Sequence, residues 1–357
     1  MKKSLSLLLA LIMAMGLFAA CGSGNGGEVP PENSGDSSVV DPPVAELNIN
    51  LLTGEEAAPG YDSSLRPTAI MINNIFPSRP QSGIGDAQVM YEMVTEGGIT
   101  RIMCVFDNYE NIPTVGPIRS ARDQMVQLMM PMGMMYLHIG ESIYARQMLD
   151  NYGWKIHEID FKHHSSYLWF DSARHNSGVN TEHCWYLTGE AISNAIAATG
   201  VITEQDYEMP LFNFVPYNEP ARELQDGEST EIFIRFSQGY HSTLTYENGR
   251  YYKSQSKTGA QIDANTGEQV SFDNVFVLFT TIEQYPNTPL SQVHFEFGGV
   301  GYYFHGGRYE RVRWIKGTAT DPLRIVDIGG NEIDVLVNTG TSYVAVVSLD
   351  EAEAFTY

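Results

Sequence analysis

Short apolar runs alternate with helix-like periods in the first half of the chain, between about residues 65 and 200. Three runs with few charges predict strands at 68–73, 89–95 and 99–106, and Gly97-Gly98 between the last two predicts a tight hairpin turn. The further elements predicted in this half are helices over 120–130, 143–152 and 190–199 and a strand over 132–139. Residues 47–222 are therefore predicted to form a mixed α/β domain.

The second half follows a different pattern, because the helical period is lost beyond about residue 226. Asn248-Gly249, Gly306-Gly307 and Gly329-Gly330 are typical of hairpin turns. The strand candidates that they separate are 230–236, 243–246, 251–254, 275–281, 293–297, 301–304, 308–314, 323–328 and 343–347. Residues 229–357 are predicted to form an all-β domain, a small sandwich or barrel, which gives the whole chain an α+β fold.

The first 46 residues resemble the leader and tether of a lipoprotein. Lys2 and Lys3 precede an uncharged apolar stretch at 7–18, which is typical of a signal peptide and falls short of the roughly 20 residues that cross a bilayer. Small residues directly before Cys21 look like a lipobox, so 1–20 is predicted to be removed and Cys21 to carry a lipid. Residues 21–46 are rich in Gly, Ser, Pro and acidic residues and predict a flexible tether.

A lipid on Cys21 would hold the protein at the extracytoplasmic face of the cell membrane. An ordinary cleaved signal peptide followed by a chance cysteine is the alternative. The net charge of −22, from 43 acidic and 21 basic residues, argues against nucleic acid as a partner and against direct docking on anionic lipid, since both call for basic patches.

Familiar catalytic and cofactor motifs are missing from the sequence. It has no GxSxG, SxxK or GxxxxGK[ST] pattern and no Gly-rich dinucleotide turn, so no cofactor is predicted. Besides Cys21 the chain has only Cys104 and Cys184, without a CxxC pair, which excludes a thiolate zinc site. A single disulfide between them and two buried free thiols are both compatible with the sequence.

The predicted hairpin carries the first candidate chemistry. Because side chains alternate along a strand, Glu92 and Glu96 should share one face, and a turn at Gly97-Gly98 would place Val94 opposite Arg101. Arg101 would then lie beside both carboxylates. This cluster could act as an acid/base pair, or it could be a structural ion-pair network beside the turn.

Two arginines form the second candidate. Arg119 and Arg122 flank the predicted start of the helix at Ser120, where backbone N–H groups and the helix dipole favour an anion. The planar guanidinium group can bind a phosphate or carboxylate through two hydrogen bonds. The alternative is that both arginines pair with neighbouring glutamates and lock the loop.

Histidines are concentrated in one stretch, with five of the nine between positions 157 and 183. Imidazole groups suit zinc or copper, but the spacings fit no helix-based metal motif. A His-rich surface loop is therefore preferred over a metal site, and no metal is predicted.

Several segments together resemble the YerB-like lipoproteins of Gram-positive bacteria. The segments that carry the resemblance are 52–54, 66–74, 79–83 (RPQSG), 86–101, 116–122 (GPIRSAR), 138–142 (HIGES) and 299–317. The resemblance implies a two-domain lipoprotein of the cell envelope and implies no established reaction. His175 and Asn176 are ligand-binding candidates on this basis, although the family tends to have Pro where this chain has Arg174.

Two functions follow from these candidates. The first is non-catalytic binding of an anionic glycan, peptide or protein partner in the cell envelope, with the β-rich half as a recognition or docking module and with Arg101, Arg119 and Arg122 among the ligand-binding candidates. The second is an enzyme acting on an anionic cell-wall substrate, in which Arg119 and Arg122 hold the charge and Glu92 or Glu96 transfers protons. The absence of a catalytic motif favours binding.

Overall fold

The computed structural model describes residues 48–205 and 209–357. The predicted signal peptide, the predicted lipidation site Cys21 and the predicted tether fall outside the described residues. In the part that is described, no helix combines the length and the apolar character needed to cross a membrane. Strands predominate and short helices accompany them, so the predicted α+β fold is confirmed.

The N-terminal half contains both kinds of element. In chain order they are β1 (Thr68–Asn73), β2 (Val89–Glu96), β3 (Ile99–Phe106), α1 (Asp123–Met129), β4 (Met135–His138), α2 (Ile143–Asn151), β5 (Glu158–Asp160), β6 (Trp169–Phe170), α3 (Ser172–Asn176), β7 (Trp185–Tyr186) and α4 (Gly189–Thr199). Gly200 ends α4 in the left-handed region at φ 67°, which is the helix end that its sequence predicts.

The C-terminal half is made of strands, apart from short 3-10 turns. They are β8 (Gly227–Glu228), β9 (Glu231–Ser237), β10 (Tyr240–Glu247), β11 (Arg250–Gln255), β12 (Gly259–Ala260), β13 (Ser271–Phe272), β14 (Asn274–Thr280), β15 (Ile282–Gln284), β16 (Ser291–Val293), β17 (Gly299–His305), β18 (Arg308–Ile315), β19 (Arg324–Asp327) and β20 (Ser342–Ser348). Each strand candidate of this half overlaps one of these strands.

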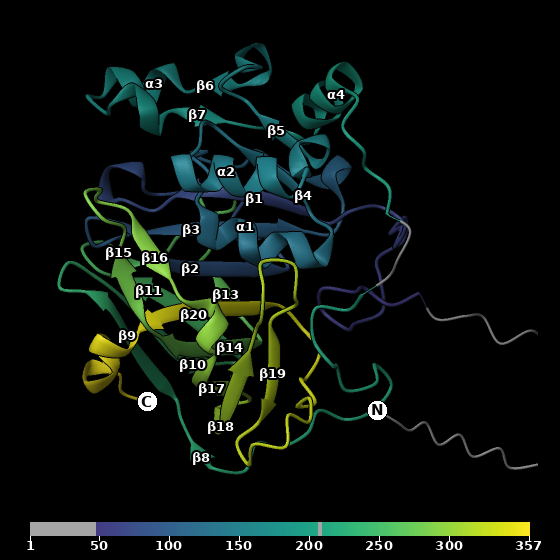
Figure 1. Cartoon of the computed structure of the whole chain (residues 1–357), viewed down its shortest axis with the longest axis vertical. Helices are drawn as coiled ribbons and strands as arrows, with labels where there is room; N and C mark the ends of the chain where they lie inside the picture. Colours follow the sequence, from purple (N-terminus) through teal and green to yellow (C-terminus); the bar gives the residue numbers. More distant parts are fainter. Residues whose placement is uncertain (1–47, 206–208) are drawn as a thin grey trace, which may run out of the picture. The chain divides into compact units, whose positions relative to one another are not determined.

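One large sheet runs through both halves of the sequence (Figure 1). Its strand order is β19-β18-β17-β14-β20-β2-β3-β1-β4-β5. The last strand, β20, lies between β14 and β2 and is parallel to both, with Val344 opposite Phe276 on one side and Tyr91 on the other. A strand with neighbours on both edges and packing on both faces is expected to be apolar, as β20 is between its end residues Ser342 and Ser348.

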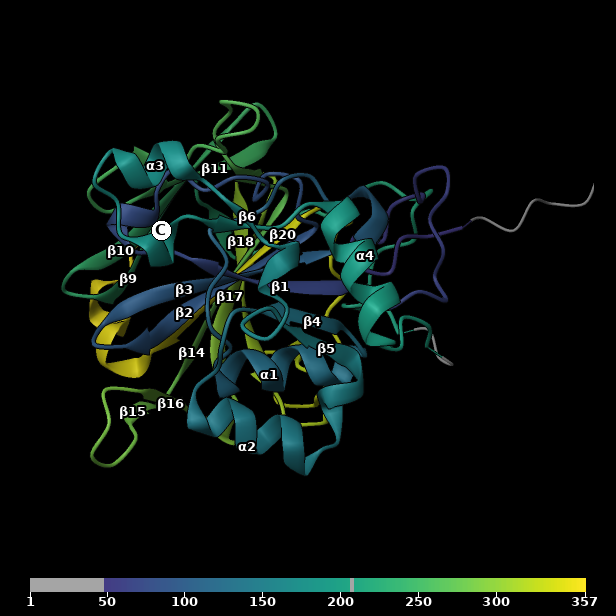
Figure 2. The same cartoon turned by 90° about the horizontal axis from the view of Figure 1, so that it is seen from above.

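The two faces of this sheet bury separate hydrophobic cores. Met71 of β1 faces the first core, to which α1 and α2 contribute Met125 and Leu149. Ile70 faces the second core, which is covered by α4 and by a smaller sheet of β9 to β13. Figure 2 shows α1 and α2 on one side of β1 to β3 and β11 on the other. The second sheet makes the C-terminal half a small sandwich.

Candidate functional site

The β2–β3 hairpin contains a β-bulge that the sequence pattern does not reveal. Glu96 pairs with Ile99 as predicted, but Val94 lies opposite Thr100 and not opposite Arg101. The pairing shifts by one residue between Val94 and Glu96. The predicted register is therefore wrong from Val94 towards the start of β2. A bulge next to a turn places one unpaired residue in the strand and rotates the residues that follow it.

The bulge separates two carboxylates that were expected to share a face. A shift of one residue moves a side chain to the opposite side of the sheet. Glu92 therefore lies on the side of the second core, 3.0 Å from Lys253, whereas Glu96 lies on the other side, 2.5 Å from Arg101. The predicted cluster of Glu92, Glu96 and Arg101 is wrong, and only Glu96 and Arg101 remain together.

Glu96 is the carboxylate that two arginines share. Arg122 donates to both of its oxygens, from Nε at 2.8 Å and from Nη2 at 2.9 Å, which is the bidentate geometry. Arg101 donates from Nη2 to Glu96 at 2.5 Å and from Nη1 to the carbonyl oxygen of Ser120 at 2.9 Å. For Arg122, the alternative prediction of pairing with a neighbouring glutamate is therefore correct.

Arg101 and Arg122 share the carboxylate of Glu96, and Arg122 also interacts with the buried carboxyl group of Asp123. Arg101 is only 1% exposed, and burial together with the charge of Arg122 lowers the pKa of its guanidinium to about 9 against the opposing effect of Glu96. Burial would raise the pKa of Glu96, but the charges and hydrogen bonds of Arg101 and Arg122 hold it below its usual value. Two guanidinium groups thus share one carboxylate, and the field of Arg119 adds to theirs.

Arg119 is the accessible arginine of the set. Its side chain is 26% exposed, and its Nη2 lies 3.1 Å from Glu182, whose side chain is 50% exposed. Its backbone is held between β1 and the residue that follows β4, because its N–H donates to Met71 and its carbonyl accepts from Ile139. Arg101, Arg119 and Arg122, with Glu96, are called the arginine cluster below.

The helix that follows the arginine cluster starts later than predicted. α1 begins at Asp123 and not at Ser120, Arg122 is its N-cap residue, and no side chain caps it. The segment before it is extended and bridges Ala121 to Glu141. With seven residues α1 is too short for its dipole to support an anion site, so that part of the prediction is wrong.

His175 and Asn176 lie on α3. Both are exposed, and the ring of His175 contacts the carbonyl oxygen of Val179 at 3.1 Å and the ring of Phe170. Within residues 48–205 and 209–357, no hydrogen bond or ion pair links either residue to the arginine cluster. The two sets of candidate residues therefore share no direct polar contact in the described part of the chain.

A groove beside α3 was not anticipated from the sequence. It measures about 450 Å³ and is lined by an exposed Trp169 with polar side chains around it, among them Asp171, Arg174 and Asn265. Arg174 fixes one wall, since it donates to the carbonyl oxygens of Pro77, Arg79 and Pro80. In the sequence, the RPQSG segment (79–83) could have pointed to this groove, because Arg79 and Pro80 belong to that segment.

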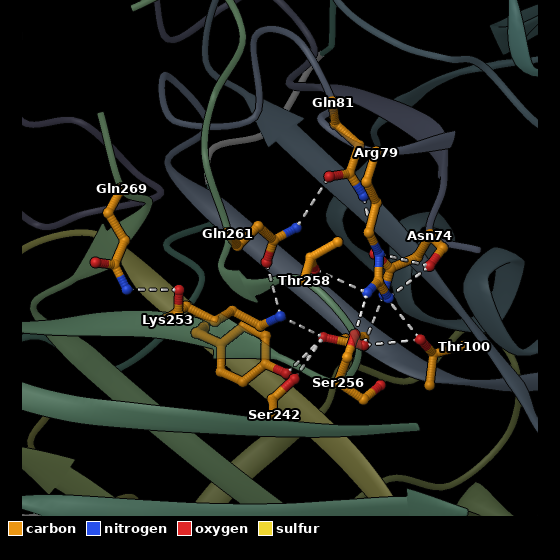
Figure 3. Close-up of polar contacts among 12 residues, drawn as sticks. Asn74, Arg79, Gln81, Thr100, Ser242, Lys253, Ser256, Thr258, Gln261 and Gln269 are labelled. Atoms are coloured by element: carbon orange, nitrogen blue, oxygen red, sulfur yellow. Dashed lines mark hydrogen bonds and ion pairs between the residues drawn. The ribbon is translucent and has the colours of Figure 1, made fainter. Parts of the chain in front are cut away.

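Glu92 belongs to a buried polar network between the two sheets, of which Figure 3 labels Asn74, Thr100, Lys253 and Gln261. Its Oε1 accepts hydrogen bonds from Asn74 at 2.9 Å and Thr100 at 2.8 Å, and its Oε2 accepts one from Tyr343 at 2.7 Å. Lys253 completes the network, with its Nζ 2.7 Å from Gln261 Oε1. The residues come from both halves of the chain.

This network is suited to holding the two halves together. Glu92 is 2% exposed and Lys253 is fully buried, so neither can reach a substrate in this conformation. Burial raises the pKa of Glu92, but Lys253 and the hydrogen bonds from Tyr343 and Thr100 outweigh it and leave this pKa below its usual value. A paired carboxylate of this kind is a poor proton donor at neutral pH.

The two remaining cysteines are free, and both are buried. Burial raises the pKa of both thiols. The alternative of two buried thiols therefore holds, and neither thiol is suited to act as a nucleophile, which requires the thiolate.

Both halves of the chain match the domains of one known protein family. The N-terminal domain of the family described as "Protein of unknown function (DUF3048)" matches residues 52–202, and the C-terminal domain of the same family matches residues 232–344. The two matches together span well over half of the chain, which therefore belongs to this family of two-domain proteins.

The YerB protein of Bacillus subtilis (strain 168) is one relative. It is 27% identical over 256 residues, covering 70% of this chain and 72% of the relative. The crystal structure of YerB from Bacillus subtilis superposes with a TM-score of 0.73 at 22% identity, covering 87% of this chain and 99% of that chain. At this identity the likeness shows the fold, and the predicted YerB-like resemblance is confirmed.

Proposed function

We propose that the chain is a lipoprotein of the cell envelope that binds an anionic group of a glycan, peptide or protein at the arginine cluster, without catalysis. The lipid on Cys21 and the extracytoplasmic face are part of the proposal. They are supported by the N-terminal sequence and by YerB, whose name gives it as a candidate lipoprotein.

The gathering of three arginines, one of them at the surface, carries the binding proposal. Arg101 and Arg122 share a single carboxylate, and Arg119 stands at the exposed edge with a solvent-exposed partner, Glu182. A carboxylate or phosphate that displaces Glu182 would meet Arg119 and would relieve the unfavourable field at Arg101. Charge-assisted hydrogen bonds to guanidinium groups favour such anions over neutral ligands.

Catalysis has less support than binding. Glu92 and Glu96 lie on opposite faces of the sheet, so they do not form an acid/base pair. Glu96 is held ionised between two arginines, which suits it to orient guanidinium groups. A binding role for His175 and Asn176 rests on the family resemblance and on their exposure on α3.

Anion titration of the purified chain tests the proposal. We expect inorganic phosphate to bind with measurable heat at low ionic strength, and Arg119→Gln to weaken this binding about tenfold or more, since a hydrogen bond to a charged group contributes roughly 1.5–3 kcal/mol. Arg324→Gln is the matched control, because Arg324 is 38% exposed and pairs with the exposed Asp334 at 2.8 Å. Equal weakening by both variants, or no binding by the wild type, would contradict the proposal.

A further inference from the structure

Three side chains with metal-ligand atoms gather where β4 ends, in the HIGES segment that the anion site does not use. His138 is the last residue of β4, Glu141 follows in the loop, and Glu158 begins the neighbouring parallel strand β5. One ring nitrogen and one oxygen from each carboxylate lie within 4.8 Å of one another. The side chains are 0%, 3% and 5% exposed, respectively.

The hydrogen bonds of this cluster leave acceptor atoms without donors. His138 Nδ1 is 2.9 Å from the carbonyl oxygen of Gly140, which can only accept, so Nδ1 carries a proton and Nε2 is the ring nitrogen available to a cation. That Nε2 lies 3.4 Å from Glu158 Oε2, which is itself an acceptor. Glu141 Oε2 is buried and has no hydrogen-bond partner in the described part of the chain. Buried acceptors of this kind need a proton or a cation.

The neighbouring basic side chains do not fill this role. Arg146 lies 2.9 Å from Oε1 of Glu141, and Lys155 lies 2.9 Å from Oε1 of Glu158, so both occupy the other oxygen of each carboxylate. They reach in from the surface, with side chains 54% and 43% exposed. Nitrogen and oxygen ligands about 2.0–2.1 Å from a tetrahedral zinc ion lie roughly 3.4 Å apart, which is the separation of His138 Nε2 and Glu158 Oε2.

We propose that His138, Glu141 and Glu158 bind a divalent transition-metal ion of the zinc class. One imidazole and two carboxylates suit zinc or a similar first-row ion, and three protein ligands leave a fourth position for water. The ion would brace the loop after β4, whose Gly140 accepts a hydrogen bond at 2.9 Å from Ala121, between Arg119 and Arg122. The inference does not depend on anion binding, because it uses none of the arginine cluster.

The metal content of the untagged chain tests this inference. After chelation and re-equilibration with micromolar zinc, we expect one ion per chain by mass spectrometry of the metal, and a higher thermal unfolding midpoint than in the chelated protein. Glu141→Gln keeps the shape of the side chain and should weaken zinc binding about tenfold or more.

Glu296→Gln is the matched control, because His294 also lies between two carboxylates, at 2.8 Å from Glu296 and 3.3 Å from Glu283, but these are 52% and 64% exposed. We expect this variant to bind zinc like the wild type. A wild-type chain that binds no zinc would overturn the inference, as would a Glu141→Gln chain that binds it equally well. If Glu141→Gln does not fold, the same zinc measurement on Glu158→Gln and the number of zinc ions per wild-type chain decide between these outcomes.

Discussion

Glu96 is the residue on which the arginine cluster depends, because it is the carboxylate that Arg101 and Arg122 share. Its pKa in the folded chain is held below the usual value near 4.5 by the two guanidinium groups, against the effect of burial. The folded state thus binds fewer protons than the unfolded state at mildly acidic pH. The stability that this pair contributes is complete above the unfolded pKa and is lost as the pH falls through the folded one.

We therefore expect the free energy of unfolding to decrease more steeply in the wild type than in Glu96→Gln between about pH 5 and pH 3. At pH 7 the variant should be about 2–3 kcal/mol less stable, which is below the full effect of breaking a buried pair because Glu96 is 20% exposed. Urea denaturation at several pH values measures both, with Asp334→Asn as the exposed control. Parallel pH profiles for the wild type and Glu96→Gln would contradict this account.

At the scale of elements, one buried ion pair joins a strand of the large sheet to a strand of the smaller sheet. Lys253 on β11 and Glu92 on β2 lie 3.0 Å apart with almost no exposure to water. Removing one partner leaves an unpaired charge in a place that water does not reach, which costs about 3–5 kcal/mol.

We expect Lys253→Met to lower the free energy of unfolding by about that amount. The double variant Lys253→Met with Glu92→Gln should recover part of the loss, because it removes the stranded charge. Thermal and chemical denaturation of the wild type, both single variants and the double variant give the coupling energy. Additive losses from the two single variants would show that the pair is not coupled.

The sequence predicts where elements occur better than it predicts how they end. The bounds of β1 and β3 match the expected 68–73 and 99–106, because largely apolar runs are local signals. The bulge before Glu96 has no such signal, since it depends on how β2 pairs with β3, and it moved Glu92 away from the predicted cluster. α1 started late because the segment before it pairs with the loop after β4, which is also a long-range effect.

At the scale of the whole molecule, the pairing of β20 with both β2 and β14 joins the two halves into one sheet. No local pattern announces this pairing, because a parallel contact between residues some 250 positions apart leaves no mark on the sequence nearby. The division into the domains 47–222 and 229–357 remains a prediction. Because the large sheet contains strands of both, we expect the two parts to depend on each other for stability.

We expect the fragment 47–222 not to fold stably alone, because the edge of β2 that pairs with β20 would be left open and the second core would lose its covering sheet. Its amide NMR spectrum should show poor dispersion, whereas the chain 47–357 should give a dispersed spectrum. Adding the fragment 229–357 should restore dispersion if the shared sheet forms between the pieces. A well-dispersed, soluble 47–222 fragment would show that β20 is dispensable for the N-terminal half.

The central claim is that the arginine cluster binds an anion. The most direct measurement follows the arginine Nε–Hε NMR signals while inorganic phosphate is added at low ionic strength. We predict saturable shifts at Arg119 and Arg122, with Arg324 unchanged. Signals that do not move, or that move equally at all three arginines, would contradict the claim.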